Sequence, residues 1–212
     1  MKNIANLHID YLINSTFYAT VAGMAGLLLI SHNKITRQLS GGDYDSRYLW
    51  KQVKSYVREL IRSSEPVVLS FDDSIEEKPY TDESELICWH WDHVFNRSVK
   101  GVNFLTALVD VQGMRLPCVV EFIKKNSWAT DKKIERVKCK SNKTKNELFR
   151  EMDNQCDRNF IFDLLVCDSW YSNVGNMEHI KGKLGRSFVV TLKSNLKVSL
   201  YLKYKRKRNK NM

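Results

Sequence analysis

The sequence contains few cysteines, and none of them forms a C-x-x-C pair. There are five, an odd number, at Cys88, Cys118, Cys139, Cys156 and Cys167. This usage argues against both a disulfide framework and a zinc ribbon. It indicates a reducing compartment, and we therefore expect the protein in the cytoplasm.

One short segment does gather residue types that bind metals. Cys88, His90, Asp92 and His93 lie close together in the sequence, but no second pair of ligands follows at zinc-finger spacing. The alternative interpretation is that residues 87–91 form a strand or its exit, with their aromatic rings packed near a site.

Long apolar runs are also missing. Residues 11–30 are largely apolar, but Asn14, Ser15, Thr16 and Thr20 interrupt them, so the run is too short and too broken for a membrane span. Only Lys2 precedes the run, which argues against a signal peptide. We therefore expect no membrane partner.

The overall composition indicates a globular protein with a polyanionic partner. The 212 residues are 43% hydrophobic and 27% charged, and the formal net charge is +10 at pH 7. Each phosphate that such a protein neutralises releases counterions from a nucleic acid, and the charge therefore favours nucleic acid as the partner.

Two hydrophobic runs each lead into a carboxylate. Residues 66–71 fill a strand pattern without interruption and end at Asp72 and Asp73, and residues 160–167 run into Asp168. The unbroken run predicts a central strand that is buried on both faces. Ligands collect beyond the carboxyl ends of strands in open α/β sheets, and carboxylates there suit Mg²⁺ or Mn²⁺. Taken singly, each Asp can instead be a turn former or a helix N-cap.

Residues 1–64 follow a helical pattern. Residues 21–30 predict one short helix, residues 31–33 a turn and residues 34–39 a second helix, which is the outline of a helix-turn-helix. If this motif reads DNA, its candidate contacts are Lys34, Thr36, Arg37 and Gln38. A helical hairpin that only packs is the alternative.

A further helix is expected over residues 46–61, and residues 63–66 mark the boundary to a second domain. Beyond it, residues 99–111 and 114–123 predict a β-hairpin with Gln112-Gly113 as its turn. A basic segment over residues 132–150 leads into a helix over residues 143–156, and residues 174–184 and 187–192 predict a last helix and strand. Residues 203–212 form a basic tail that would bind phosphates without sequence preference.

An ordered set of short motifs resembles the DDE transposases of bacterial insertion sequences. They are Glu-Lys-Pro-Tyr-Thr at 77–81, Cys-Trp-His-Trp-Asp-His at 88–93, Val-Lys-Gly-Val-Asn-Phe-Leu at 99–105, Thr-Lys-Asn-Glu-Leu at 144–148 and Val-Cys-Asp-Ser-Trp at 166–170. The resemblance covers most of residues 7–199. It implies an α/β fold: a helical DNA-binding domain over residues 1–64, a truncated ribonuclease H-like core with a mixed sheet over residues 65–202, and the tail.

The resemblance also implies a function and its residues. DDE transposases hold two divalent metals about 4 Å apart with two Asp and one Glu, and use them to cleave and join DNA. The first Asp corresponds to Asp73, with Asp72 as the alternative, and the second to Asp168, with Mg²⁺ or Mn²⁺ as the cofactor. Partners would be double-stranded DNA, as transposon ends and target, and a possible second copy of the chain. The DNA contacts in the core are expected at Lys143, Lys145 and Arg150.

The third acid of that family has no counterpart here. It lies on a helix well beyond the strand at 187–192, whereas no acidic residue follows that strand in this sequence. Glu147 and Glu178 are the only glutamates close by in pattern, and both lie on helices that the family does not use for the metal. We therefore expect a truncated transposase with a defective strand-transfer centre, or alternatively a non-catalytic DNA-binding remnant or regulator of transposition.

Overall fold

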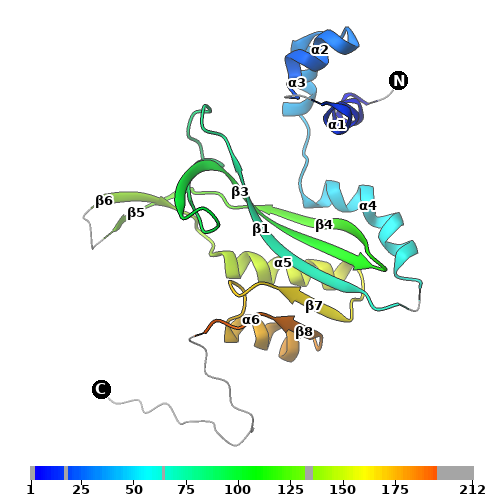
Figure 1. The fold of residues 1–212 in the computed structure, drawn as a ribbon, viewed down its shortest axis with the longest axis vertical. Coiled ribbons are helices and arrows are strands. Elements are labelled where there is room, and N and C mark those ends of the chain that lie inside the picture. Colours follow the sequence, from blue (N-terminus) through cyan, green and yellow to red (C-terminus); the bar gives the residue numbers. More distant parts are fainter. Residues whose placement is uncertain (1–2, 17–18, 64, 132–135, 195–212) are drawn as a thin grey trace, which may run out of the picture. The chain divides into compact units, whose positions relative to one another are not determined.

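The structure is a computed structural model that describes residues 3–16, 19–63, 65–131 and 136–194. The chain divides into two compact units, Met1–Tyr44 and Asp45–Met212 (Figure 1). The predicted basic tail, residues 203–212, lies outside the described residues.

The first unit is helical. Its elements are α1 (Ile4–Asn14), α2 (Val21–Leu28) and α3 (His32–Ser40). The Thr20 side chain caps α2 by accepting a hydrogen bond from the Gly23 amide at 3.0 Å. Met24 and Ile35 are completely buried and hold the helices together. The two expected helices are therefore present, and α3 begins two residues earlier than predicted.

Helix α4 (Ser46–Leu60) belongs to the second unit. Asp45 caps it by accepting from the amides of Arg47 and Tyr48, each at 2.9 Å. The Val120 amide of the sheet donates to the Ser46 hydroxyl at 3.1 Å, and Val57 is completely buried in the core of this unit. The two compact units therefore divide before α4, whereas the sequence placed a boundary near residue 64, because the apolar face of α4 packs on the sheet.

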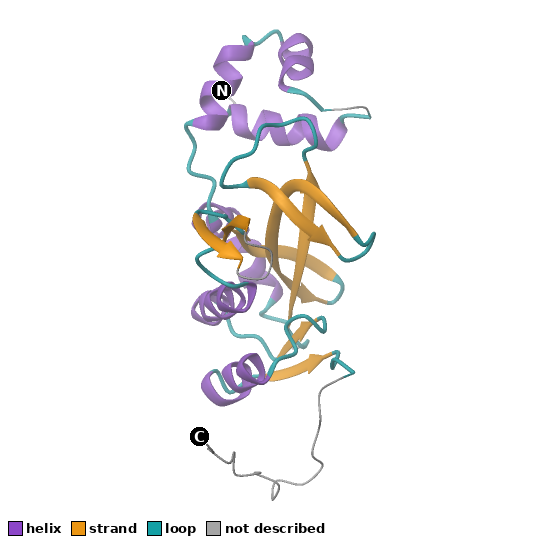
Figure 2. Ribbon diagram, turned by 90° about the vertical axis from the view of Figure 1, so that its left-hand side faces the viewer, coloured by secondary structure: helices purple, strands orange, loops and turns teal. Residues whose placement is uncertain are grey.

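A mixed sheet forms the centre of the second unit (Figures 1 and 2). Its strands are β1 (Val68–Glu77), β2 (Ile87–Asp92), β3 (Arg97–Val111), β4 (Met114–Phe122), β7 (Leu164–Cys167) and β8 (Ser187–Val190). The order is β2-β3-β1-β7-β8, and β4 also pairs with β3. Strand β3 is antiparallel to β1, β2 and β4, whereas β1, β7 and β8 are parallel. The expected arrangement, a hairpin beside a parallel set, is confirmed.

The turn of that hairpin is the predicted one. Gln112 and Gly113 have φ angles of 55° and 80°, so both occupy the left-handed region that two-residue hairpin turns require. The Asp110 carboxylate accepts from the Gly113 amide at 3.1 Å and closes the turn.

Strand β1 differs from its prediction in two ways. It does not end at the carboxylates but continues to Glu77, because Asp72 and Asp73 pair with Thr106 and Leu105 of β3. It is also not buried on both faces, since buried and half-buried side chains alternate along it up to Phe71. The two carboxylates therefore stand on a regular strand, on opposite faces of the sheet.

Helix α5 (Lys145–Asn159) covers the buried face. It begins with a capping box between Thr144 and Glu147. The Phe149 ring lies 4.5 Å from the Phe71 ring and 5.0 Å from the Tyr171 ring, which joins the helix to β1 and to the segment after β7. This packing places the start of α5 beside Asp73.

Four further elements complete the described part. The predicted helix at 174–184 is α6 (Val174–Glu178) followed by the π-helical turn η1 (His179–Lys183). The small two-stranded sheet of β5 (Ser127–Asp131) and β6 (Arg136–Lys140) was not predicted. The strand expected over residues 160–167 is shortened to β7, because Asp163 instead accepts a hydrogen bond from the Val67 amide at 2.8 Å.

Candidate active site

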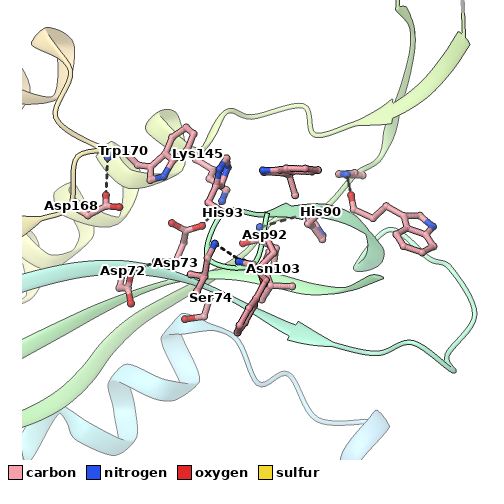
Figure 3. Close-up of a pocket in the computed structure, with 16 residues that line it drawn as sticks. Asp72, Asp73, Ser74, His90, Asp92, His93, Asn103, Lys145, Asp168 and Trp170 are labelled. Carbon is pink, nitrogen blue, oxygen red and sulfur yellow. Dashed lines mark hydrogen bonds and ion pairs between the residues drawn. The ribbon is translucent and has the colours of Figure 1, made fainter. Parts of the chain in front are cut away.

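A polar pocket of about 720 Å³ opens on the buried face of β1 beyond Phe71 (Figure 3). It is lined by β1 from Asp72 onward, by β2 and the turn after it, by the start of α5 and by the segment after β7. Asp73 and Asp168 both line it, as their positions at the ends of two hydrophobic runs predicted.

Asp73 and Asp72 point in opposite directions from β1. Figure 3 shows the Asp73 carboxylate on the side of Lys145 and Asp168, and the Asp72 and Ser74 side chains on the other side of the strand. Strand alternation requires this difference, because neighbouring residues of a strand face opposite sides of the sheet. Asp72 instead accepts a hydrogen bond from the Asp73 amide at 2.9 Å.

Two side chains contact the Asp73 carboxylate. Lys145, the first residue of α5, forms an ion pair and a hydrogen bond with Oδ2. The Tyr171 hydroxyl donates to Oδ1 at 3.4 Å. Burial and the charges of Asp73 and Asp168 raise the pKa of Tyr171, so its hydroxyl keeps its proton and remains a donor.

Asp168 follows the last residue of β7 and begins a tight turn. Its carboxylate accepts from the Trp170 amide at 3.0 Å, which is the structural role that an Asp after a strand commonly has. Burial, followed by the charges of Asp73 and Asp72, raises the pKa of Asp168. The carboxylates of β1 and of the turn therefore repel each other in the pocket.

The floor of the pocket is formed by β2 and β3. His90 and Asn103 are almost completely buried, and the Asn103 amide lies 3.5 Å from Nδ1 of His90. Burial and the charges of Lys125 and Lys145 lower the pKa of His90 to about 4, so the ring is neutral at physiological pH. Oδ1 of Asn103 is buried without a hydrogen-bond partner among the described residues.

Aromatic rings form the rim. The His93 ring lies 4.5 Å from the Trp170 ring and 6.4 Å from the Trp91 ring, so the three rings link β2 to the turn after Asp168. Lys193 lies over the Trp170 ring at 4.7 Å from its centroid. Trp91 and Trp170 remain about half exposed despite these contacts.

The family model described as DDE superfamily endonuclease matches residues 5–210, which is nearly the whole chain. The chain belongs to the DDE superfamily endonucleases. The resemblance seen in the sequence motifs is thereby confirmed at the level of the superfamily. No curated protein matches this superfamily member in sequence.

Solved transposases are similar to this DDE superfamily member in structure. The piggyBac transposase in its synaptic complex with hairpin DNA has 9% sequence identity and a TM-score of 0.48, over 91% of this chain and 42% of that chain. The Mos1 transposase paired-end complex with the left transposon end has 10% sequence identity and a TM-score of 0.31, over 88% of this chain and 58% of that chain. A pre-cleavage Mos1 transpososome has 10% sequence identity and a TM-score of 0.29, over 88% of this chain and 58% of that chain. The chain thus spans less than two thirds of these transposases.

The donor set of this DDE superfamily member fits one divalent cation. Asp73 and Asp168 supply hard oxygen ligands, and their mutual repulsion is the kind of electrostatic cost that a cation relieves. Within the described residues, no three His, Cys, Asp or Glu side chains gather closely enough to hold a metal. Glu147 is engaged in the cap of α5, where Thr144 lowers its pKa, and Glu178 ends α6 away from the pocket lining.

The predicted basic contacts are spread over the chain. Of the three predicted in the core, Lys143, Lys145 and Arg150, only Lys145 lines the pocket. Lys143 forms an exposed ion pair with Glu151 at 2.7 Å, and Arg150 donates to the Asn176 side chain at 2.7 Å in a network that joins α5 to α6. That network gives Arg150 a structural role beside the predicted one.

The remaining candidates lie on α3, within the first unit. Lys34, Arg37 and Gln38 are exposed and line one hollow of its surface. The Thr36 hydroxyl donates to the His32 carbonyl of the same helix at 3.1 Å.

Sequence reasoning missed Tyr171, Asn103 and Lys125 as residues of the pocket, and it considered His90 only within the metal-binding residue types at 88–93. Asn103 had a signal, because it is a polar residue at a position that alternation assigns to the buried face of β3. Tyr171 lies three residues after Asp168, but its contact with Asp73 depends on the pairing of β1 and β7.

Every helix that the structure describes falls short of the length and apolarity that a membrane span requires.

Proposed function

We propose that the chain is the ribonuclease H-like core of a transposase, with a helical DNA-binding unit before it, and that Asp73 and Asp168 hold Mg²⁺ or Mn²⁺. One observation supports this most strongly: two carboxylates from adjacent parallel strands line one pocket of a DDE superfamily member. A bound cation would polarise a phosphodiester and activate water or a 3′-hydroxyl.

The neighbouring side chains would have supporting roles. Tyr171 keeps its proton and orients Asp73 through its hydroxyl. The Trp170 amide fixes the Asp168 carboxylate at the start of its turn. Lys145, once released from Asp73, supplies a positive charge at the start of a helix, where a DNA phosphate can be bound.

Double-stranded DNA is the partner that the charge favours. The net charge of +10 suits a polyanion, and exposed Lys34, Arg37 and Gln38 share one hollow of the first unit. We assign base and phosphate contacts to α3, and phosphate contacts to the start of α5.

We further propose that this chain binds DNA without cleaving it at a useful rate. In-line displacement requires stabilisation of both the attacking and the leaving oxygen, which commonly takes two metals and a third acid. Among the described residues, no group of three His, Cys, Asp or Glu side chains is placed to hold a metal ion. The affinity for DNA comes from Lys and Arg and does not depend on that acid.

Calorimetry with Mn²⁺ tests the assignment of the site. We expect the unmodified chain to bind the cation, and Asp168→Asn to weaken binding about tenfold or more because one of two carboxylates is lost. Asp92→Asn is the matched control: Asp92 lines the same pocket, but its carboxylate accepts from the Val94 amide at 2.8 Å. Equal affinities in all three proteins would remove Asp168 from the site.

A further inference from the structure

One buried oxygen of the pocket has no hydrogen-bond partner among the described residues. Asn103 on β3 is 2% exposed and lines the pocket, and this oxygen is its Oδ1. The amide nitrogen of the same side chain lies 3.5 Å from Nδ1 of His90, so the oxygen is the amide atom without a partner. A buried acceptor without a donor costs free energy, so a donor is expected there in at least one state of the site.

The pairing of β1 with β3 places Asn103 close to Asp73. Asp73 pairs with Leu105 of β3, and Ile75, two residues further along β1, pairs with Asn103. Asp73 and Asn103 therefore lie on the same face of the sheet, as diagonal neighbours on adjacent strands. The side chains of such neighbours begin about 7 to 8 Å apart, which is within reach of a long side chain.

Lys145 is a long side chain that lies beside both residues. It belongs to the first residue of α5, forms the ion pair with Asp73, and lines the same pocket as Asn103 (Figure 3). Its charge also acts on the floor of the pocket, since it contributes to the lowered pKa of His90 after burial and Lys125. The Lys145 side chain is 38% exposed, so its outer part has room to change its rotamer.

A cation bound by Asp73 would displace this ammonium group. Two positive charges at one carboxylate repel each other, and a carboxylate oxygen attracts a divalent ion more strongly than a singly charged group. The displaced ammonium group still requires an acceptor. Oδ1 of Asn103 is an uncharged acceptor in the same pocket, whereas the Asp168 carboxylate would itself hold the cation.

We infer that Asn103 is the positioning residue of Lys145, because it accepts a hydrogen bond from the ammonium group while Asp73 and Asp168 hold a cation. Lys145 thus has two positions, on Asp73 without the cation and on Asn103 with it. The second position keeps a positive charge inside the pocket after the cation binds. This inference rests on the proposed function, since it takes a cation at the two carboxylates.

A double-mutant cycle measured by Mn²⁺ calorimetry tests the inference. Asn103→Leu removes the acceptor and should weaken Mn²⁺ binding about fivefold, because the ammonium group then loses its second position and competes more strongly for Asp73. In a Lys145→Met background the same change should have no effect, since no ammonium group has to be placed. Ser74→Ala is the matched control: Ser74 lines the pocket from the other side of β1, and its loss should change neither affinity.

Nuclear magnetic resonance of the His90 ring gives a second readout, which does not need the leucine variant. Diamagnetic Mg²⁺ should shift the ring signals of the unmodified protein, because the ammonium group moves toward the floor of the pocket. The shift should be much smaller in Lys145→Met. Circular dichroism shows whether each variant keeps its fold, and Asn103→Ser replaces Asn103→Leu in the cycle if the leucine variant unfolds.

The outcomes separate this inference from the function on which it rests. An equal loss of affinity in both backgrounds would show that Asn103 acts on the site without Lys145, and the positioning role would be wrong. Unchanged affinity in Asn103→Leu would also overturn that role, but would leave the cation site in place. If the unmodified protein binds neither Mn²⁺ nor Mg²⁺, the proposed cation site is wrong and the positioning role with it.

Discussion

Lys145 at the start of α5 forms an ion pair with Asp73 in the middle of β1, 72 residues earlier in the chain. The Asp73 side chain is 18% exposed and that of Lys145 is 38% exposed, so the pair is only partly screened by solvent. The ammonium group of Lys145 therefore already neutralises the carboxylate of Asp73, which is the proposed metal ligand. A divalent cation must compete with this ammonium group.

The first prediction concerns that competition. Lys145→Met should raise the Mn²⁺ affinity of the DNA-free protein about tenfold, because a like charge near the site is removed. With saturating DNA the increase should shrink, since a phosphate then draws Lys145 away from Asp73 in the unmodified protein. Calorimetric titration with Mn²⁺, with and without DNA, measures both effects.

Two other lysines serve as controls for this prediction. Lys125 lines the same pocket but donates to the Trp89 carbonyl, and Lys143 pairs with Glu151 outside it. If Lys125→Met or Lys143→Met raises the affinity as much as Lys145→Met does, general electrostatics explains the result and the direct ion pair does not.

The second prediction concerns a buried carboxyl that the proposed chemistry does not use. Asp153 on α5 is completely buried, its oxygens lack hydrogen-bond partners among the described residues, and Nε2 of His179 lies 3.6 Å away. Burial, together with the charge of Asp157, raises the pKa of Asp153 from 3.8 to about 7, against the opposing effect of Arg186. Between pH 3.8 and about pH 7 the folded chain binds more protons than the unfolded chain, so the free energy of unfolding falls as the pH rises.

Asp153→Asn removes this loss because the amide does not ionise. We expect the variant to gain stability over the unmodified protein on going from pH 5 to pH 8, by about 2 kcal/mol or roughly 6 °C in melting temperature. The neighbouring His179, whose pKa is lowered by burial and by Lys183 and Arg150, is neutral at pH 8 in both proteins.

Asp157→Asn provides the comparison for the pH effect. Asp157 lies one turn further along α5 and forms an ion pair with Arg186 at 2.7 Å. Its loss should lower the melting temperature at pH 5 and less so at pH 8, because it also removes one of the charges that raise the pKa of Asp153. A difference between Asp153→Asn and the unmodified protein that stays constant with pH would show that Asp153 does not titrate in this range.

The third prediction concerns DNA binding by the first unit. If about six phosphates are neutralised, log affinity for duplex DNA should fall with log salt at a slope near −5. Lys34→Ala should reduce that slope by about one, and Arg37→Ala should in addition change the sequence preference if α3 reads bases. Fluorescence anisotropy over a range of salt concentrations provides the slopes.

Arg115→Ala is the control for this measurement. Arg115 pairs with Asp110 at 2.8 Å beside the β3–β4 turn, and we expect no change in slope from its loss. An affinity that does not depend on salt would exclude nucleic acid as the partner.

The fourth prediction is that the chain alone does not nick DNA. Removing one member of a catalytic group that acts as a unit commonly costs several powers of ten in rate. Incubation with Mn²⁺ and DNA that carries transposon ends should therefore yield no 3′-hydroxyl nicks. Nicking that disappears in Asp168→Ala would show instead that the site is complete, and Glu147, Glu178 or a second copy would then be tested as the source of the third acid.

The parts of the fold that depend on local signals were predictable from the sequence. The β3–β4 hairpin follows from Gln112-Gly113 between two apolar runs, and α5 follows from its capping box and apolar spacing. Asp73 and Asp168 were expected to meet because parallel strands deliver their carboxyl ends to one sheet edge, and both line one pocket. Their roles as ligands remain predictions.

The parts that depend on distant partners were not predictable. The end of β1 is set by β3, which pairs with Asp72 through Glu77 and so extends the strand past its apolar run. The division between the units is set by α4, whose amphipathic pattern fits a sheet as well as a helical bundle. The contacts of Lys145 and Tyr171 with Asp73 join three separate elements, and no spacing in the sequence reports them.

Strand β1 runs four residues past Asp73, whereas its neighbour β7 stops at Cys167, immediately before Asp168. The residues of β1 before and after Asp73 thus pair with β3, whereas Asp168 lies in a turn. The structural adjustment on ligand binding must therefore come from the Asp168 turn and the first turn of α5. In hydrogen exchange, the β1 amides that are bonded to β3 on either side of Asp73 should open only with global unfolding, whereas those of residues 169–172 should open locally and far more often.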